Sequence, residues 1–446
     1  MQLSAAARCC DTVHRGADVM LHGVSTDTRR LRTGELYIAL RGEHFDGHDF
    51  LAQAAERGAA AVMIDQNCDT SLPALPVNNT RTAMGRLAAC WRERFEVPVV
   101  AVTGSNGKTT VKEMLAAILA CRGRVLATAG NLNNDIGVPL TLFRLDDSHD
   151  SAVIELGANH PGEIDYLAGL VSPDVGIVTN AGPAHLEGFG SLEGVARAKG
   201  ELFARLAADA TAVLNADDPF YTQWCETAAH CRQVSFGIDH PADVRAVNVR
   251  LGEDSEFDIE GPWGSATVCL SLPGRHNVMN ALAAAAAALA VGATILEVIT
   301  GLSSLQAVQG RLQIRRGLNG SRVIDDTYNA NPESLQAAIR VLAGYEGRRV
   351  LVLGDMAELG DKAAQLHWQA GRTAHEQGID ALYTLGELSH QAASAFGKQA
   401  HSFNDRDSLI RAVTQQLSDT TTVLVKGSRA MHMEQVVSAL TGDNEA

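Results

Sequence analysis

The chain has 446 residues, of which 46% are hydrophobic and 20% are charged, so we expect two to four domains of an ordinary globular protein. This composition excludes an intrinsically disordered, collagen-like or small disulfide-stapled chain. The formal net charge of −15 argues against a broad nucleic-acid-binding surface, which needs an excess of lysine and arginine.

The N-terminal sequence and the apolar runs predict where the protein is found. The opening MQLSAAARCCDTVHRG lacks the basic region and apolar core of a signal peptide, and no apolar run reaches the roughly 18 residues that span a membrane. We therefore expect a cytoplasmic protein without a membrane span. Its eight cysteines are expected as reduced thiols in that compartment, and their spacing matches no zinc site.

Residues 1–81 form the first of three regions that differ in pattern. The short alternating runs 35–40 and 60–64 predict strands, and the turn-rich segment RGEHFDGHDF lies between them. Residues 72–81 contain two prolines and two asparagines. This segment is predicted to be a linker that ends the first domain.

Residues 82–310 alternate between apolar strands and helices. A β-branched run at 97–102 predicts a strand that leads into a helix at 108–121, and the alanine-rich tract 281–290 predicts a packed helix. Further buried strands are predicted at 152–156, 175–179 and 212–215. Such alternation indicates parallel βαβ units, in which ligands gather at the carboxyl ends of the strands.

Residues 311–446 restart the alternation and predict a second doubly wound α/β domain. Its strands are predicted at 322–326, 349–353, 381–385 and 422–425. The predicted fold class is therefore α/β, with three domains at 1–81, 82–310 and 311–446.

The sequence VAVTGSNGKTT at residues 100–110 indicates a phosphate-binding loop between a strand and a helix. Backbone N–H groups and the helix N-terminus attract a polyphosphate, Lys108 would meet the β- and γ-phosphates, and the Thr109 hydroxyl would ligate Mg²⁺. The loop is a shortened variant, because Val102 stands where a first glycine is usual. The predicted nucleotide-binding residues of the loop are Gly104, Ser105, Asn106, Gly107, Lys108, Thr109 and Thr110.

Two further features bear on the nucleotide. A guanine-reading Asn-Lys-x-Asp run is missing, which favours adenine. Glu155 closes a neighbouring predicted strand, where a metal-binding carboxylate is expected. The alternative for Glu155 is a buried structural carboxylate.

Seven segments occur in the order seen in the Mur ligases, and the chain resembles that family along nearly its whole length. Mur ligases are ATP-dependent amino-acid and peptide ligases of bacterial cell-wall synthesis. The segments are TGSNGKTT (103–110), IELGANHPGEI (154–164), NAGPAHLEGFGS (180–191), ARAKGELF (196–203), PGRHNVMNALAA (273–284), QGRL (309–312) and DDTYNANPESL (325–335).

Three strings narrow the resemblance to one activity. GNLNNDIGVPLTL (130–142), NANP (329–332) and LGDMAELG (353–360) are similar to the family member that adds D-alanyl-D-alanine to UDP-N-acetylmuramoyl-tripeptide. The resemblance implies ATP and Mg²⁺, an acyl-phosphate intermediate and a monomer that binds neither nucleic acid nor membrane. It also implies an N-terminal UDP-substrate domain, a central P-loop-type parallel-sheet ATPase domain and a C-terminal Rossmann-like domain.

The resemblance assigns catalytic, metal and nucleotide roles to single residues. Catalysis would rest on Lys108, Glu155, His185, Lys199 and Arg311, with Lys199 carbamylated by CO₂ so that it can ligate metal. The metal ligands would be Thr109, Glu155, His185 and Lys199, and the adenosine contacts Asn277, Asn280, Asp326 and Tyr328. The alternatives are a structural role for His185, a surface position for Lys199 and helix capping by Asn277.

The substrate-binding residues implied by the resemblance fall into four groups. In the order listed next, the first and second groups would bind the UDP end. The third group would bind the peptide arm or the sugar, and the fourth would bind D-alanyl-D-alanine. These groups are Ser25, Thr26, Asp27 and Arg29; Asp46, Gly47 and His48; Asn131 and Asn134, together with Asn133; and Asn329, Asn331 and Ser334. Polar turns are the alternative for every group.

Three other readings of the sequence remain open. A sister ligase would add a different amine, such as diaminopimelate or a folyl-linked glutamate, but NANP disfavours the former and the long N-terminal region with DGH the latter. A nucleotide-dependent switch would be expected to keep the full phosphate-loop spacing. A Rossmann-type binding protein would leave the catalytic set unexplained.

Overall fold

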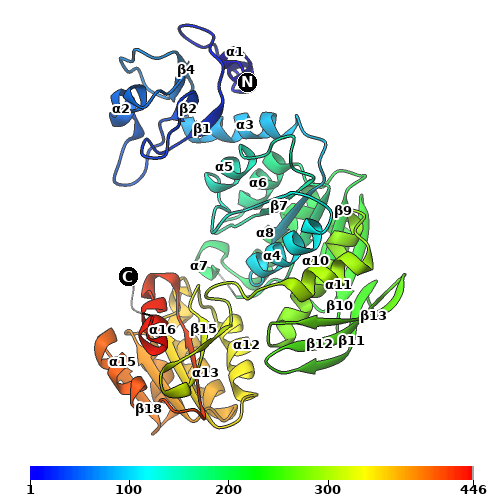
Figure 1. Cartoon of the computed structure of the whole chain (residues 1–446), viewed down its shortest axis with the longest axis vertical. Coiled ribbons are helices and arrows are strands. Elements are labelled where there is room, and N and C mark those ends of the chain that lie inside the picture. Colours follow the sequence, from blue (N-terminus) through cyan, green and yellow to red (C-terminus); the bar gives the residue numbers. More distant parts are fainter. Residues whose placement is uncertain (184, 444–446) are drawn as a thin grey trace. The chain divides into compact units, whose positions relative to one another are not determined.

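The computed structural model describes residues 1–183 and 185–443, which divide into two compact units (Figure 1). The first unit comprises Met1–Ala101, Gly123–Ala158 and Glu163–Asp174, and the second comprises Val102–Arg122, Asn159–Gly162 and the chain from Val175 onwards. In the described residues, no helix combines the length and the apolar character that crossing a membrane requires.

The N-terminal sheet has four parallel strands in the order β1-β2-β3-β4. Strands β2 and β3 confirm the predictions at 35–40 and 60–64. The bounds are β1 Gly23–Ser25, β2 Glu35–Ile38, β3 Ala61–Ile64 and β4 Ala74–Pro76, with α1 Leu3–Cys9, a 3₁₀ turn Gly47–Phe50, α2 Leu51–Glu56 and α3 Thr80–Arg92.

The prediction of a linker at 72–81 is wrong, because this segment contains β4 and the start of α3. Strand β4 lies at the edge of the sheet, where Pro76 costs no ladder hydrogen bond. Asn79 caps α3 by accepting a hydrogen bond from the Thr82 N–H at 2.9 Å. Turn-forming residues therefore end a short strand and begin a helix here.

Helices α1 and α3 pack together in one hydrophobic core and are also joined covalently. Leu3 and Ala6 of α1 share this core with Met84 and Leu87 of α3. A disulfide links Cys9 to Cys90, so the prediction that all the cysteines are reduced is wrong for this pair. The two residues are 81 positions apart, and only the fold brings them together.

The central sheet has nine strands in the order β13-β12-β11-β10-β9-β8-β5-β7-β6. The predicted strands at 97–102, 152–156, 175–179 and 212–215 are confirmed as β5, β7, β8 and β9. The bounds are β5 Val99–Thr103, β6 Val125–Ala127, β7 Ser151–Glu155, β8 Val175–Val178, β9 Thr211–Asn215, β10 Arg232–Gly237, β11 Val244–Leu251, β12 Ser255–Gly261 and β13 Gly264–Leu270.

The sequence did not predict the last three strands of this sheet, but it did predict the long alanine-rich helix of the same region. The antiparallel meander β11-β12-β13 was not predicted, since its strands alternate buried with exposed residues rather than forming apolar runs. The predicted helix at 281–290 is confirmed as the end of α10, in which Ala281 and the alanines at 283–288 are buried. The helices are α4 Lys108–Ala120, α5 Gly137–Leu142, α6 Glu163–Val171, α7 Leu186–Phe189, α8 Leu192–Arg205, α9 Tyr221–Thr227, α10 Arg275–Ala290 and α11 Ile295–Ser304.

The C-terminal sheet has six strands in the order β14-β15-β19-β16-β17-β18, and only β14 is antiparallel to its neighbour. Separate cores on its two faces include residues of α12, α13 and α14 on one side and of α15 and α16 on the other, which confirms a doubly wound region. The strands are β14 Gln313–Arg316, β15 Arg322–Asp326, β16 Arg348–Gly354, β17 Ala381–Leu385, β18 Ala400–Phe403 and β19 Thr421–Lys426. The helices are α12 Pro332–Ala343, α13 Ala363–Glu376, α14 Ser389–Phe396, α15 Arg406–Thr414 and α16 Glu434–Thr441, with 3₁₀ turns Leu318–Gly320, Gly360–Lys362 and Arg429–Met431.

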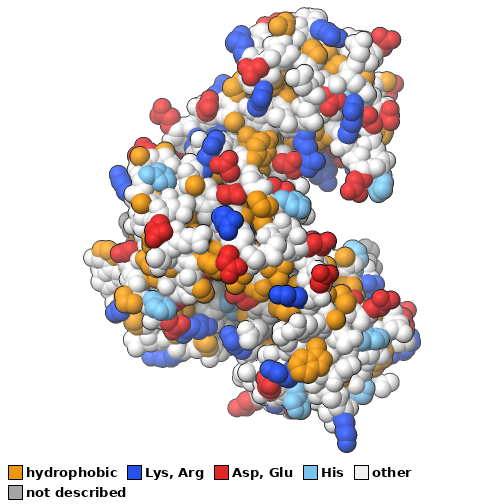
Figure 2. Space-filling view, turned by 180° about the vertical axis from the view of Figure 1, so that it is seen from behind, with side chains coloured by type: hydrophobic (Ala, Val, Ile, Leu, Met, Phe, Trp, Pro, Cys, Tyr) orange, Lys and Arg blue, Asp and Glu red, His pale blue; other side chains and the backbone are white. Residues whose placement is uncertain are grey.

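Charged side chains of both signs are interspersed on the face of the molecule that Figure 2 shows. Mixed charge of this kind is ordinary for a folded protein surface and gives that face no continuous basic stripe.

Candidate active site

The phosphate loop of the second unit runs from the end of β5 to the start of α4. Gly104 and Gly107 have positive φ angles of 145° and 82°, which other residues rarely adopt. A Cβ on Gly104 would overlap the Thr179 hydroxyl, and one on Gly107 would overlap the Asn280 amide oxygen. The loop backbone therefore lies so close to Thr179, which follows β8, and to Asn280 of α10 that a side chain does not fit at either glycine.

The segment after β8 holds the loop with hydrogen bonds. Asn180 accepts from the Asn106 N–H at 2.9 Å, and the Thr179 hydroxyl donates to the Asn106 carbonyl at 2.6 Å. The Ser105 hydroxyl donates to the Gly182 carbonyl at 3.0 Å. Thr179 and Asn180 were not among the predicted site residues, although the run NAGPAH that contains Asn180 was noted.

Lys108 and Arg311 bring two cationic groups to the loop. The Lys108 ammonium donates to the Gly104 carbonyl at 2.6 Å, and Arg311 Nη2 donates to the Thr109 hydroxyl at 3.2 Å. The Arg311 guanidinium stacks on Tyr328, 4.0 Å from the ring centroid. Its Nε is buried without a hydrogen-bond partner in the part of the chain that the structure describes. An anion at the loop could use this donor.

Asn277 and Asn280 are buried in the first turns of α10 beside the loop. The Asn277 amide donates to the Pro273 carbonyl at 2.8 Å, and the Asn280 amide donates to Asn277 Oδ1 at 3.2 Å. The pair thus supports the start of α10 and the position of Gly107.

Asp326, at the end of β15, forms a buried ion pair with Lys426 of β19 at 2.5 Å. The Lys426 ammonium also donates to the Asn329 carbonyl at 3.0 Å. Burial lowers the pKa of Lys426, and Asp326 opposes that shift. Sequence reasoning did not include Lys426, although a lysine that follows the apolar run 422–425 marks the carboxyl end of a strand.

His276 lies at the start of α10 near the same ion pair. Burial lowers the pKa of His276 to about 4; Asp326 opposes the shift and Lys426 adds to it. This histidine is therefore neutral near pH 7.

His185 and Lys199 also lie near the loop of the second unit. His185 has a positive φ of 53° and forms an ion pair with Glu358. Glu358 belongs to the string LGDMAELG that contributes to the family resemblance. Burial lowers the pKa of His185, and the positive charges of Lys108 and Lys199 add to the shift while Glu358 opposes it. Lys199 is 1% exposed, with its Nζ 5.3 Å from the Phe189 ring centroid.

The described residues contain no group of three or more His, Cys, Asp or Glu that could hold a metal ion alone. Magnesium at nucleotide sites is bound by one or two protein oxygens together with substrate phosphates and water. The Thr109 hydroxyl and the Glu155 carboxylate are ligands of that kind.

The N-terminus of α12 meets the phosphate loop within the second unit. Asn331 and Ser334 form a capping box for α12, and the Asn331 amide donates to Asn106 Oδ1 at 2.8 Å. The Asn106 amide in turn donates to Glu333 Oε2 at 2.8 Å. Asn329 accepts from the Ala330 N–H at 2.8 Å. Glu333 was not predicted, and its contact joins residues 227 positions apart.

Glu155 lies in the first unit, at the carboxyl end of β7, and is 2% exposed. Its Oε1 accepts from the Asn133 amide at 2.8 Å. Asn134 accepts from the Gly137 N–H at 2.8 Å at the start of α5, and Asn131 is exposed. Asn133 thus contacts Glu155 directly.

The first group of UDP candidates forms a polar turn after β1. The Ser25 hydroxyl donates to the Asp27 carbonyl at 3.0 Å, and Arg29 pairs with Asp27 at 2.8 Å. Thr26 is partly exposed between them. Arg29 is 83% exposed at its side chain, which leaves it open to solvent.

The second group forms a tight turn against β2 and β3. Asp46 contacts buried His48 through Nδ1 at 2.5 Å, and His48 Nε2 accepts from the Asp65 N–H at 3.3 Å. A Cβ on Gly47 would lie 2.7 Å from the Leu40 carbonyl oxygen, so a side chain does not fit there. Asp65, which also pairs with Arg41 at 3.1 Å, was not predicted.

Three family models match successive parts of the chain. They are the Mur ligase family catalytic domain at residues 20–92, the Mur ligase middle domain at 102–288 and the Mur ligase glutamate ligase domain at 310–429.

Known proteins match the chain over almost its full length. The UDP-N-acetylmuramoyl-tripeptide--D-alanyl-D-alanine ligase of Escherichia coli is 47% identical over 96% of this chain and 95% of its own. A crystal structure of MurF from Acinetobacter baumannii is 36% identical, with a TM-score of 0.94 over 99% of both chains. The MurF ligase of Thermotoga maritima in complex with ADP is 29% identical, with a TM-score of 0.88 over 96% of this chain and 99% of that one.

Proposed function

This chain belongs to the Mur ligase family, and we propose that it joins D-alanyl-D-alanine to the terminal carboxylate of UDP-N-acetylmuramoyl-tripeptide with the cleavage of ATP. The products are UDP-N-acetylmuramoyl-pentapeptide, ADP and phosphate, and the reaction belongs to peptidoglycan precursor synthesis.

The observation that carries this proposal is the 47% identity, over 95% or more of both chains, to an E. coli enzyme named for this reaction. The geometry of the phosphate loop supports it independently. Closely packed glycines, Lys108 and the unsatisfied Nε of Arg311 suit a bound polyphosphate.

ATP is held at the loop in this account, and Mg²⁺ accompanies it. Thr109 offers a hydroxyl oxygen and Glu155 a buried carboxylate, and each is an oxygen donor of the kind that magnesium prefers. His185 and a carbamylated Lys199 would complete the protein ligands. When bound, Mg²⁺ neutralises negative charge that develops on the phosphates.

The reaction needs an activated carboxylate, because an amine does not displace oxide from a carboxylate at a useful rate. The γ-phosphoryl group of ATP moves to the carboxylate, the amine of D-alanyl-D-alanine attacks the acyl phosphate, and phosphate leaves. Lys108 and Arg311 stabilise the anionic phosphoryl group with fixed positive charge. Asn277, Asn280, Asp326 and Tyr328 form the adenosine side of the site.

The remaining assignments follow the division at 1–81, 82–310 and 311–446. The first domain holds the UDP end of the substrate, through the turns at residues 25–29 and 46–48. Asn131 and Asn134 contact the peptide arm or sugar, and Asn329, Asn331 and Ser334 recognise D-alanyl-D-alanine. We place this reaction in the cytoplasm and assign it to a monomer.

An amine panel tests the proposal against the sister ligases. Phosphate release is measured with ATP, Mg²⁺ and UDP-N-acetylmuramoyl-tripeptide, and with D-alanyl-D-alanine, diaminopimelate or glutamate as the amine. We expect rapid release only with the dipeptide. A preference for either amino acid would overturn the acceptor assignment, and release that needs no UDP-linked peptide would favour a nucleotide-dependent switch.

A further inference from the structure

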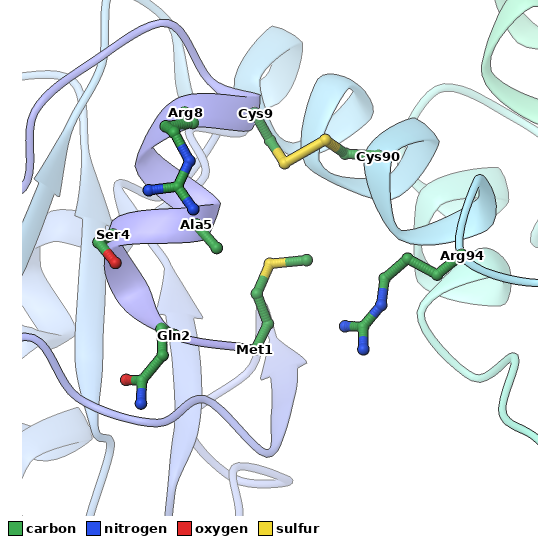
Figure 3. A pocket seen from close by; sticks show the side chains of 8 residues that line it. All are labelled: Met1, Gln2, Ser4, Ala5, Arg8, Cys9, Cys90 and Arg94. Carbon is green, nitrogen blue, oxygen red and sulfur yellow. A yellow bond between two sulfur atoms is a disulfide. The ribbon is translucent and has the colours of Figure 1, made fainter.

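A surface pocket of the first unit has a disulfide in its wall. The pocket has a volume of about 630 Å³, and Figure 3 shows Cys9 and Cys90 at one side of it. Cys9 belongs to α1 and Cys90 to α3, and both are partly exposed. The pocket is therefore the side from which a thiol in solution would approach the disulfide.

The same pocket is basic, although the whole chain carries a formal charge of −15. Arg8 and Arg94 line it and are exposed, and the N-terminal amino group of Met1 lies beside them. The Arg94 guanidinium is held over the Trp91 ring, 4.6 Å from its centroid. None of the described residues that line the pocket is Asp or Glu.

One carboxylate outside the pocket lining, Asp18, interacts electrostatically with Arg8. Asp18 accepts hydrogen bonds from the Ser4 N–H and the Ser4 hydroxyl, both at 2.8 Å. Asp18 offsets part of the Arg8 charge. Because two arginines and no Asp or Glu are among the described lining residues, the pocket keeps a net positive potential beside the disulfide, and an anionic solute is attracted to it.

We propose that Cys9–Cys90 is a thiol–disulfide exchange site that preferentially takes a small thiol carrying carboxylates, such as glutathione. The thiolate attacks one sulfur, the Cys9–Cys90 bond breaks, and the released cysteine thiolate takes up a proton. A second molecule of the small thiol attacks the mixed disulfide and frees the other cysteine. In balance, two small thiols become one small-molecule disulfide, and the protein gains two thiols.

Exchange can proceed on the folded protein, because α1 and α3 remain joined by their shared hydrophobic core. Leu3 and Ala6 belong to the same hydrophobic cluster as Met84 and Leu87, and these contacts do not involve the bridge sulfur atoms. The bridge is therefore a site that can respond to the redox state of its surroundings while the N-terminal sheet persists. This inference does not depend on the reaction proposed above.

The test compares an anionic with a cationic thiol on the full-length protein. Protein with the bridge closed is treated with glutathione or cysteamine, and alkylation followed by mass measurement gives the rate of bridge loss. We expect Arg8→Gln and Arg94→Gln each to slow bridge loss with glutathione by about threefold or more. Bridge loss with cysteamine should be unchanged or faster. Both arginines are exposed, so these variants should fold.

A matched control lies on the same helix as Cys90. Arg86 is exposed, pairs with Asp11 at 3.2 Å and is not a pocket residue, so Arg86→Gln should leave both rates unchanged. Equal glutathione rates in Arg8→Gln, Arg94→Gln and Arg86→Gln would overturn the proposal. Equal slowing of glutathione and cysteamine would overturn it too, since a loss of positive charge cannot slow a cationic thiol.

Discussion

Gly104 is the residue at which the backbone of the phosphate loop has least freedom. Its φ of 145° is unfavourable for other residues, and an added Cβ would overlap the Thr179 hydroxyl. We expect Gly104→Ala to weaken ATP binding by about tenfold or more, a change of about 1.4 kcal/mol. Isothermal titration with an ATP analogue measures it.

The control for this prediction is Gly344→Ala. Gly344 has an ordinary helical φ of −76°, and its added Cβ would meet only ordinary contacts of 3.4 Å or more. This variant should bind the analogue like the parent protein. Equal affinities for Gly104→Ala and Gly344→Ala would mean that the loop geometry does not set nucleotide binding.

Lys199 is buried on α8 near His185. If it is carbamylated, Lys199→Ala should lose activity, and added short carboxylates should restore part of it by supplying the missing metal ligand. The exposed Lys398→Ala is the control and should stay active. A carbamate signal in ¹³C NMR after incubation with labelled bicarbonate is a second readout, and a fully active Lys199→Ala would refute the role.

His276 should make stability depend on pH. Its pKa is about 4 in the folded protein, whereas an unfolded histidine titrates near 6.5. The unfolded state therefore binds more protons below pH 6.5, so stability is complete above that pH and falls as pH drops towards 4. His276→Gln should reduce the loss of the melting temperature between pH 7.5 and 5.

Exposed His22 supplies the comparison for this measurement. His22→Gln should keep the pH dependence of the parent protein. If the melting temperature of His276→Gln depended on pH as that of His22→Gln does, the pKa of His276 would not differ between the folded and unfolded states.

At the residue scale, the sequence identified site residues that stand in a recognisable local motif. Lys108 and Thr109 stand in a glycine-rich loop, and Arg311 was added by resemblance; the structure brings all three together. Thr179, Asn180 and Glu333 were missed. Each contact with Asn106 spans more than 70 positions. Thr179 and Asn180 lie at the carboxyl end of a predicted strand, which was the available signal, whereas no local pattern marks Glu333.

At the scale of elements, the link between α1 and α3 should contribute to stability. A disulfide restricts the unfolded chain, and one that spans 81 residues is expected to add about 2–4 kcal/mol to the free energy of unfolding. Reduced protein and Cys90→Ser should therefore lose the structure of the N-terminal sheet at lower denaturant concentration than oxidised protein. Circular dichroism and hydrogen exchange measure this loss.

Cys269→Ser is the matched control, because Cys269 is exposed and free. It should unfold like the parent protein under oxidising conditions. Identical unfolding of Cys90→Ser and Cys269→Ser under those conditions would contradict a stabilising bridge.

In the central sheet, strands with continuous apolar runs were predictable, and the meander strands with alternating burial were not. Strands β5, β7, β8 and β9 are buried at every position and were identified from their composition. Strand β11 exposes several positions, so its pattern resembles a polar segment. Strand β4 is only three residues long and ends at a proline, which led to the prediction of a linker.

At the scale of the whole molecule, resemblance contributed what physical patterns could not. Alternating strands and helices established α/β architecture, but the order of the strands in each sheet depends on pairings between distant segments. The contacts of α12 with the phosphate loop are of the same long-range kind. They connect the C-terminal sheet to the nucleotide site within the second unit and are consistent with a catalytic role for both regions.

The measurement that tests the account most directly is the mass of the product. Purified protein is incubated with ATP, Mg²⁺ and UDP-N-acetylmuramoyl-tripeptide, with and without D-alanyl-D-alanine. The account predicts a UDP-linked pentapeptide that appears only with the dipeptide, together with one phosphate for each amide bond. Phosphate release with the dipeptide present but without a new amide product would contradict it.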